Sequence, residues 1–387
     1  MKNKYSREKI KFFKYFLVSI YLIIIFFFYK SFYLYYFDKN FMLYKQLKKE
    51  ENFVRACSND KKKLILFENY NNPKISLVIP IFNDEKYILR LMKSIQKQDI
   101  KEIEIIFVED CSTDNSLNII KECIRIDKRI KYIKNDQNKG CLYSYAKGIL
   151  EAKAKYTMII DQDDMLLSDL KTLIRISIKY KRDIIDFSYL QGKENNYSKI
   201  IMPDREFIQP ELGEVFFKDK YIGKTHINKK IYKTETIKNA IRTLKDEYLN
   251  SHVILHCDTL LFVCIFCNSQ TYRSFGNLFS QFHFLNENTA SSNIISKYNK
   301  LFSDSIYLIK YISELKYSSK EVYNRHITKA LGILEWPINM SKNKRLEFDW
   351  NKFNETINAI LNNNDLDEIN KNRTYKDLNL VKERIIK

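Results

Sequence analysis

The chain is predicted to fold as an α/β protein built on a doubly wound, mostly parallel sheet. Three observations predict this class. Between Lys74 and Ile160, strand and helix signals alternate four times at the spacing of βα units, which is typical of a parallel sheet. Acidic residues follow two of the expected strands. The chain has 387 residues, of which 45% are hydrophobic, so it can form a sizeable core.

Each element is expected from the spacing of its apolar residues. Strands are predicted at residues 75–80, 103–108, 130–133 and 156–160. Apolar residues at helical spacing predict three helices between them, with these inward faces: Ile88, Leu91, Met92 and Ile95; Leu117, Ile120 and Ile124; Leu142, Tyr145, Ala146 and Ile149. Asn83 or Asp84 is expected to cap the first helix.

Carboxylates follow the second and the fourth strand. Glu109 and Asp110 end the second, and the run Asp161–Asp164 follows the fourth. Because parallel strands meet with their carboxyl ends at one edge, where open α/β sheets bind ligands, we expect these acids to lie together. Crowded carboxylates repel one another unless a cation separates them, so the run predicts Mg²⁺ or Mn²⁺ holding a diphosphate. A solvated acidic turn is the alternative interpretation.

The ordered motifs resemble those of family 2 glycosyltransferases with the GT-A fold. Four segments carry the resemblance: Ser76–Asn83, Val108–Asp114, Asn138–Gly140 and Asp161–Asp164. A weaker similarity continues through Asn228–Glu235 to His256–Leu260. The resemblance implies a hexosyltransferase-like enzyme that transfers a sugar, with inversion, from a UDP- or GDP-linked donor to a hydroxyl of a glycan, lipid or protein acceptor.

The resemblance also implies roles for the residues of the nucleotide side. Pro80 and Phe82 would bind the nucleotide, with Phe82 stacked on the base and Asp110 hydrogen-bonded to its edge. Asp161 would reach the ribose or support the metal ion, and Asp163 would bind the Mn²⁺ or Mg²⁺ directly. The resemblance therefore implies a nucleotide-sugar site of the DXD type.

Further residues complete the implied site. Asp164 would be an auxiliary acid, together with Glu109, which stands where the family usually has aspartate. Asp258 would take the proton from the acceptor hydroxyl, with an ordinary helix N-cap as the alternative. Cys257 stands where the family has glutamate. The segment Tyr145–Gly148 occupies the place of an arginine that faces the diphosphate in the family.

Three of these departures suggest a second function class. Glu109, Cys257 and the missing arginine also fit a catalytically inactive relative that binds nucleotide or glycan as a partner subunit. Lys139 or Lys147 would replace the family's arginine in an active enzyme. Turnover that is lost on removal of Asp258 would exclude the inactive class.

The N-terminus predicts a membrane anchor. Tyr15 to Tyr29 carries no charge and apolar character continues to Phe37, which is long enough for one spanning helix. A cleaved signal peptide is the alternative. Lysines before the span favour a type II signal-anchor with a lumenal catalytic domain in the Golgi or endoplasmic reticulum, and a cytoplasm-facing enzyme stays open. The expected parts are a cytoplasmic tail and transmembrane anchor at 1–37, a stem at 38–72, a glycosyltransferase domain at 73–290 and a helical extension at 291–387. Within the domain, the nucleotide half is expected at 73–165 and the acceptor half at 166–290.

The net charge, the cysteines and the histidines say less about function than the motifs do. The net charge of +19 is spread along the chain without a nucleic-acid motif, so nucleic-acid binding is not predicted. The seven cysteines include a single CxxC, Cys264–Cys267, and are expected to be buried thiols. A third metal ligand is left open among the five histidines: His226, His252, His256, His283 and His326.

Overall fold

The computed structural model describes residues 64–167, 170–193, 196–208, 226–253, 256–285 and 298–315, and the single positions 45, 48, 49, 52, 355 and 358. All of the continuous segments belong to one compact unit, Phe53–Lys387. The expected membrane span from Tyr15 to Phe37 lies outside the described residues. Within the described ones, no helix is both long and apolar enough to cross a bilayer.

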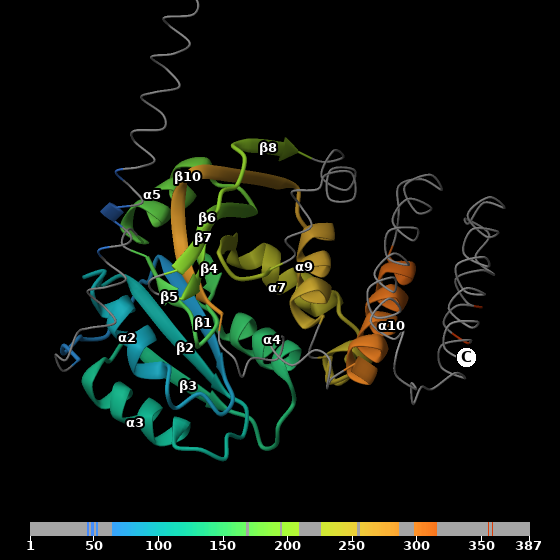
Figure 1. The fold of residues 1–387 in the computed structure, drawn as a ribbon, viewed down its shortest axis with the longest axis horizontal. Helices are drawn as coiled ribbons and strands as arrows, with labels where there is room; N and C mark the ends of the chain where they lie inside the picture. Colours follow the sequence, from blue (N-terminus) through green and yellow to red (C-terminus); the bar gives the residue numbers. More distant parts are fainter. Residues whose placement is uncertain are drawn as a thin grey trace, which may run out of the picture. The chain divides into compact units, whose positions relative to one another are not determined.

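One ten-stranded sheet organises this unit (Figure 1). The strand order is β3-β2-β1-β4-β9-β6-β10-β5, with β7 paired to β6 and β8 to β10. The strands are β1 Ile75–Ile81, β2 Ile103–Glu109, β3 Ile130–Lys134, β4 Tyr156–Ile159, β5 Met165–Leu166, β6 Ile184–Lys193, β7 Asn196–Ile200, β8 Arg205–Ile208, β9 Lys230–Lys233 and β10 Thr271–Phe284. The four strands predicted from the sequence are β1 to β4, each within one residue of its expected bounds.

Only one half of the sheet follows the predicted parallel pattern. Strands β3, β2, β1 and β4 run parallel to one another, whereas β9 is antiparallel to both β4 and β6. Strand β10 is parallel to β6, and β5, β7 and β8 are antiparallel to their partners. The prediction of a mostly parallel sheet is therefore wrong for the second half. The regular βα repeat ends at β4. Strand β5 follows β4, and β7 follows β6, without a helix between them, so antiparallel pairing becomes possible.

Helices cover both faces of the sheet, as a doubly wound fold requires. On one face lie α2 Ile88–Gln96, α3 Ser116–Ile126 and α5 Leu170–Tyr180, and on the other lie α4 Cys141–Glu151, α7 Thr234–Thr243, α9 Cys257–Cys267 and α10 Tyr298–Glu314. A short helix, α8, spans Asp246–Leu249. Strand β1 is buried on both sides. Leu77 and Ile79 belong to the core on the face covered by α2, α3 and α5, and Val78 belongs to the core on the opposite face.

Helix α4 lies unusually close to the sheet at Gly148. A Cβ atom at this position would lie 2.5 Å from Val78 Cγ1 and 2.8 Å from Val108 Cγ2, so a larger residue would push the helix away. The helix begins after Gly140, whose φ of 87° is readily adopted only by glycine. These two glycines place the first turn of α4 next to the carboxyl ends of β1 and β2.

The first helix starts later than the sequence predicts. Helix α2 begins at Ile88 with Tyr87 at its N-cap, so neither Asn83 nor Asp84 caps it. The Asp84 carboxylate instead accepts a hydrogen bond from the Phe82 backbone N–H at 3.2 Å, and Asn83 has a positive φ of 56°. A loop of several residues therefore separates the end of β1 from the start of α2.

Segments at both ends of the domain pack onto it. Phe67, in the expected stem, is 9% exposed and its ring lies 3.6 Å from the Arg129 guanidinium. Its backbone forms a bridge with Asp127. In the expected helical extension, α10 buries Ile306 and Ile309 in the same core as α9. The described end of the expected stem and the start of the expected extension thus pack on the unit built around the sheet.

Candidate active site

The loops after β1 and β2 are joined at the carboxyl edge of the sheet. Asn83 Oδ1 accepts hydrogen bonds from the backbone N–H and the hydroxyl of Thr113, at 2.8 and 3.2 Å. The Asn83 N–H donates to Ser112 Oγ at 3.1 Å. Phe82 lies on this loop with 43% of its surface exposed, so its ring is available for stacking. Pro80 is buried in β1 beside Val108, away from that surface.

Asp110 organises the turn that precedes α4. Its carboxylate accepts hydrogen bonds from Asn135 Nδ2 at 2.7 Å and from the N–H groups of Lys139 and Gly140, both at 2.8 Å. Glu109 is 1% exposed, and within the described residues its Oε2 atom has no hydrogen-bond partner. Both acids are therefore buried beneath the loops, and the structure shows Asp110 holding the turn.

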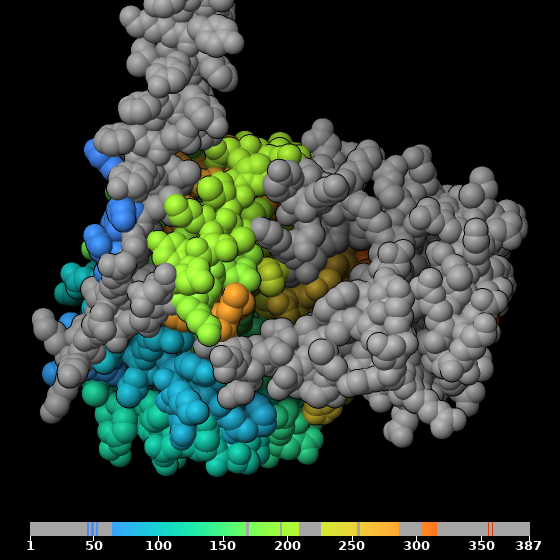
Figure 2. All heavy atoms as spheres, in the orientation of Figure 1, coloured from blue at the N-terminus to red at the C-terminus, as the bar shows by residue number. Residues whose placement is uncertain are grey.

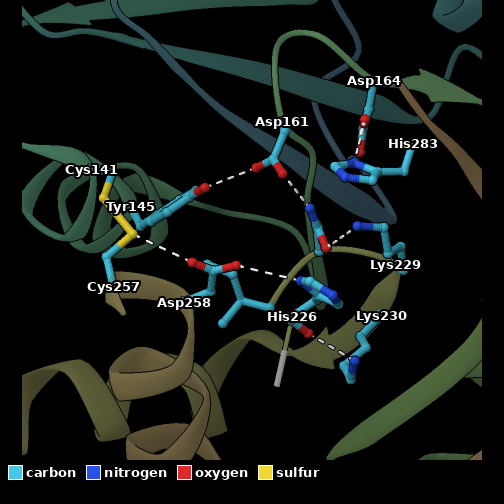
Figure 3. Close-up of polar contacts among 12 residues, drawn as sticks. Cys141, Tyr145, Asp161, Asp164, His226, Lys229, Lys230, Cys257, Asp258 and His283 are labelled. Atoms are coloured by element: carbon cyan, nitrogen blue, oxygen red, sulfur yellow. Dashed lines mark hydrogen bonds and ion pairs between the residues drawn. A yellow bond between two sulfur atoms is a disulfide. The ribbon is translucent and has the colours of Figure 1, made fainter. Parts of the chain in front are cut away.

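Asp161 is held from two sides (Figure 3). The Tyr145 hydroxyl donates to Asp161 Oδ1 at 2.8 Å, and Asn228 Nδ2 donates to Asp161 Oδ2. Tyr145 comes from α4, and Asn228 precedes β9. Both donors bind the carboxylate and fix its orientation.

Asp164 and His283 complete a candidate cation site with Asp161. His283 Nδ1 lies 2.9 Å from Asp164 Oδ1, and the three side chains offer ligand atoms that all lie within 4.8 Å of one another. The other oxygen of Asp164, Oδ2, is buried and without a hydrogen-bond partner in the described chain. Asp163, the ligand expected from the sequence, is not in this group; its carbonyl accepts a hydrogen bond from Arg90 at 2.6 Å.

The three candidate ligands shift one another's ionisation. Burial, together with the charge of Asp164, raises the pKa of Asp161 to about 6, against the opposing charge of Lys229. Burial would also raise the pKa of Asp164, but the neighbouring His283 holds it below its ordinary value. Conversely, Asp164 raises the pKa of His283 despite burial. The pair is therefore an ion pair beside a carboxylate that ionises with difficulty when no cation is near.

Asp258, the expected base, lies in the first turn of α9. Its Oδ2 atom lies 3.6 Å from His226 Nδ1. Burial favours a higher pKa for Asp258, but the interaction with His226 keeps it below its ordinary value, so the carboxylate is ionised at neutral pH. Burial lowers the pKa of His226, which favours a neutral imidazole beside this carboxylate. An ionised, oriented carboxylate is suited to accept a proton.

A disulfide lies between the two helices of the site. Cys141 is the first residue of α4, Cys257 is the first residue of α9, and their sulfur atoms are bonded (Figure 3). The expectation that all cysteines are buried thiols is therefore wrong for this pair. Sequence spacing could not reveal the bond because 116 positions separate the two residues. Cys264 and Cys123 are buried free thiols, as expected, whereas Cys267 is exposed and Cys111 is half-buried, contrary to the expectation.

Four polar residues of the site were not singled out from the sequence. Tyr145 was predicted on the inward face of a helix and noted in the place of the family's arginine, and Asn228 and Lys229 were only part of a weaker similarity. His283 was one of five histidines without a distinguishing motif. These residues come from segments that are far apart in the sequence. In Figure 2 the end of β10, in orange, reaches the surface between the nucleotide half, in blue, and strands β6 to β8, in yellow-green.

The comparison with protein families agrees with this geometry. Residues 76–240 match the family model "Glycosyl transferase family 2". This segment is a glycosyltransferase family 2 domain. The match begins at the second residue of β1 and ends within α7, so the domain contains the acidic run and Asn228. The predicted family resemblance is confirmed.

Two curated relatives are similar to this glycosyltransferase domain. Glycosyltransferase GlyA of Streptococcus pneumoniae is 30% identical over 167 residues, which cover 43% of this chain and 23% of that protein. The GalNAc(5)-diNAcBac-PP-undecaprenol beta-1,3-glucosyltransferase of Campylobacter jejuni is 29% identical over 178 residues, covering 42% of this chain and 57% of the relative. The chain thus spans less than two thirds of either relative.

Solved structures share the fold over a longer stretch. The crystal structure of S. aureus TarS 1-349 aligns with a TM-score of 0.60 and 16% identity, over 81% of this chain and 89% of that chain. The same fragment in complex with UDP-GlcNAc aligns with a TM-score of 0.56 and 15% identity. At this identity the likeness shows the fold, and it supports the GT-A fold expected for the glycosyltransferase domain.

Proposed function

We propose that this protein is a metal-dependent, inverting glycosyltransferase that moves a sugar from a nucleotide-diphosphate sugar to an acceptor hydroxyl. One observation carries the proposal: Asp161 and Asp164, from the loop between β4 and β5, meet His283 of β10 at the sheet edge, with the ionised Asp258 in the same site. A UDP- or GDP-linked sugar is the donor class that such a site fits. TarS has been solved with UDP-GlcNAc, which supports a uridine donor.

The chemistry of the donor set fits Mn²⁺ or Mg²⁺. Two carboxylates and one imidazole are hard or borderline ligands, and the mixed set suits Mn²⁺ best. The buried and unpartnered Asp164 Oδ2 is an oxygen that a cation would satisfy. A bound cation would neutralise charge that develops on the departing nucleoside diphosphate. Asp161, Asp164 and His283 would hold it.

Other residues of the site would bind the nucleotide and accept the proton. Phe82 stacks on the base, and the turn held by Asp110 borders the nucleotide. Asp258 accepts the proton of the acceptor hydroxyl while that oxygen bonds to the anomeric carbon and the bond from this carbon to the diphosphate breaks. Because the attack and departure are in line, the configuration inverts in a single step. His226 keeps Asp258 ionised.

The acceptor and the membrane location rest on weaker support. The C. jejuni relative is named for a polyprenyl-diphosphate-linked acceptor, so a glycan carried on a lipid is the acceptor class we favour. Such an acceptor suits an enzyme held at a membrane by the apolar segment that ends at Phe37. The lumenal orientation and the Golgi or endoplasmic reticulum stay predictions.

Turnover of nucleotide sugars tests the function directly. We expect the full-length protein to release UDP or GDP from a nucleotide sugar with Mn²⁺ and not with a chelator. Asp258→Asn should lower kcat by about 100- to 10,000-fold, the usual contribution of a general base, and leave the affinity for nucleotide nearly unchanged. Asp246→Asn removes an exposed acid from α8 and serves as the matched control. Nucleotide binding without turnover would instead identify the inactive partner-subunit class.

A further inference from the structure

Two adjacent lysines at the start of β9 are buried in different ways. Lys230 is 3% exposed, and its ammonium forms an ion pair with Asp186 at 3.2 Å and donates to the His226 carbonyl at 2.7 Å. Lys229 is 1% exposed, yet in the described part of the chain its ammonium makes a hydrogen bond only to the neutral amide of Asn228, at 2.7 Å. It also lies 4.9 Å from the Tyr189 ring centroid. A buried ammonium without a contacting carboxylate is unfavourable for stability.

The backbone of Lys229 is also unfavourable. Its φ is 70°, in the left-handed region that side chains other than glycine rarely occupy. Such conformations persist where the surrounding structure imposes them, and they concentrate at functional sites. Burial and backbone together indicate that Lys229 has a role in the site rather than in folding.

Asn228 links this charge to the acid cluster. An ammonium can only donate and an ionised carboxylate can only accept, so the Asn228 amide has one possible orientation, with Oδ1 toward Lys229 and Nδ2 toward Asp161. Through this amide, the Lys229 ammonium lies one side chain away from Asp161, a candidate ligand of the cation. Figure 3 shows Lys229 on the same side of the site as Asp164 and His283.

A fixed positive charge here has opposite effects on the two partners of the site. It repels a divalent cation that enters alone among the carboxylates, and it attracts the diphosphate of a nucleotide. A cation and a diphosphate that arrive together satisfy the carboxylates and the lysine at once. The binding of each should therefore strengthen the binding of the other.

We propose that Lys229 makes cation binding depend on the nucleotide: it weakens binding of the cation alone and strengthens binding of the cation together with a nucleoside diphosphate. The proposal rests on the proposed function, because it takes the acid cluster as the cation site. It assigns a positioning and charge-compensating role to a residue that no motif identifies. The coupling would keep the site from holding a cation without its donor.

Titration of the full-length protein with Mn²⁺, alone and with UDP or GDP present, tests the proposal. Lys229→Gln is the central variant, since glutamine can still donate to Asn228 but carries no charge. We expect it to bind Mn²⁺ alone at least about fivefold more tightly than the wild type, and the gain in Mn²⁺ affinity from nucleotide to shrink at least about fivefold. Lys229→Met should behave alike, and Lys229→Arg should keep the wild-type coupling.

Lys233→Met is the matched control. It removes one positive charge from the same strand, but this lysine exposes 47% of its side chain and lies 3.8 Å from Asp183, outside the cluster. Its coupling should equal that of the wild type. Circular dichroism verifies that each variant is folded.

The outcomes separate the inference from the function on which it rests. If folded Lys229→Gln binds Mn²⁺ alone no more tightly than the wild type, or keeps the full gain from nucleotide, the charge-coupling role is overturned. A wild-type protein that binds neither Mn²⁺ nor nucleotide with Mn²⁺ overturns the proposed function itself, and the inference with it. Wild-type binding with the predicted change in the variant supports both.

Discussion

The two halves of the sheet contribute to the candidate site in different ways. In the nucleotide half, β1, β2 and β4 each end in a loop that carries site residues, so chain order alone brings Phe82, Asp110 and Asp161 to one edge. In the second half, the site residues come from distant segments. His283 pairs with Asp164 across 119 positions, and Asn228 reaches Asp161 across 67. The first half therefore carries the residues that sequence motifs identify, and the second half supplies the side chains that contact them.

Strand register explains how the second half does this. Strand β10 pairs antiparallel with β5, so that Phe282 lies opposite Met165. The next residue along β10 is His283, and the residue before Met165 is Asp164. This one pairing therefore determines the histidine of the candidate cation site. Variants that remove one side chain from each half test how much each half contributes to cation binding and to stability.

The largest effect is expected from the second half. His283→Ala removes one of three candidate ligands, so Mn²⁺ affinity should fall by more than the roughly 10- to 100-fold typical of losing an outer-shell partner. Asp163→Asn, at the ligand position expected from the sequence, should have a smaller effect. Calorimetric titration of both variants with Mn²⁺ and UDP gives the order. A larger loss of Mn²⁺ affinity in Asp163→Asn than in His283→Ala would show that Asp163, the ligand expected from the sequence, binds the cation.

The disulfide that joins the halves comes next. It links α4 to α9 across 116 positions, and such a bond typically stabilises a protein by about 2–4 kcal/mol. Addition of a dithiol reductant should lower the free energy of unfolding by about that amount. Denaturant titration with and without reductant measures it. Cys141→Ser and Cys257→Ser should lose the response to reductant, and a reductant effect that survives in them would place its origin elsewhere.

A substitution in the nucleotide half should act through packing alone. Gly148→Ala would place a Cβ atom 2.5 Å from Val78 Cγ1, so we expect a destabilisation of about 1–3 kcal/mol. Because α4 also positions Tyr145, cation affinity should fall slightly as well. Thermal unfolding measures the first effect and Mn²⁺ titration the second. Unchanged stability would mean that α4 can move away from the sheet at little cost.

The smallest expected effect is a pH dependence of stability in the loop after β1. Burial raises the pKa of Asp84 to about 6. Because this folded pKa exceeds the unfolded value, protonation favours the folded state, and the contribution is fully present only at acid pH and is lost as pH rises through 6. Asp84→Asn should thus stabilise the protein by about 1–2 kcal/mol at pH 7.5 and by little at pH 4. Chemical denaturation at both values measures the difference, and equal effects would contradict it.

Particular residues show how far sequence reasoning reached. The four strands of the nucleotide half followed from apolar spacing, because each βα unit is determined largely by neighbouring residues. The acids after two of these strands were read directly from the sequence. Asp258 was expected as the base, with an ordinary helix N-cap as the alternative. It lies in the first turn of α9, whose N-cap is His256, so the N-cap alternative is wrong and the role as the base stays a prediction. Asp110 was expected near a bound base, whereas the structure shows it holding the turn before α4.

The sequence by itself determined the family, the parallel half of the sheet and the acids at its edge, because these depend on short-range patterns of hydrophobicity and charge. Only the tertiary structure decided that His283 joins Asp161 and Asp164, that Lys229 faces the cluster through Asn228, and that Cys141 bonds to Cys257. The reason is that β9, β10 and α9 come from far along the chain. Where they pair and pack is decided by the register and burial of the whole sheet, which no local spacing encodes.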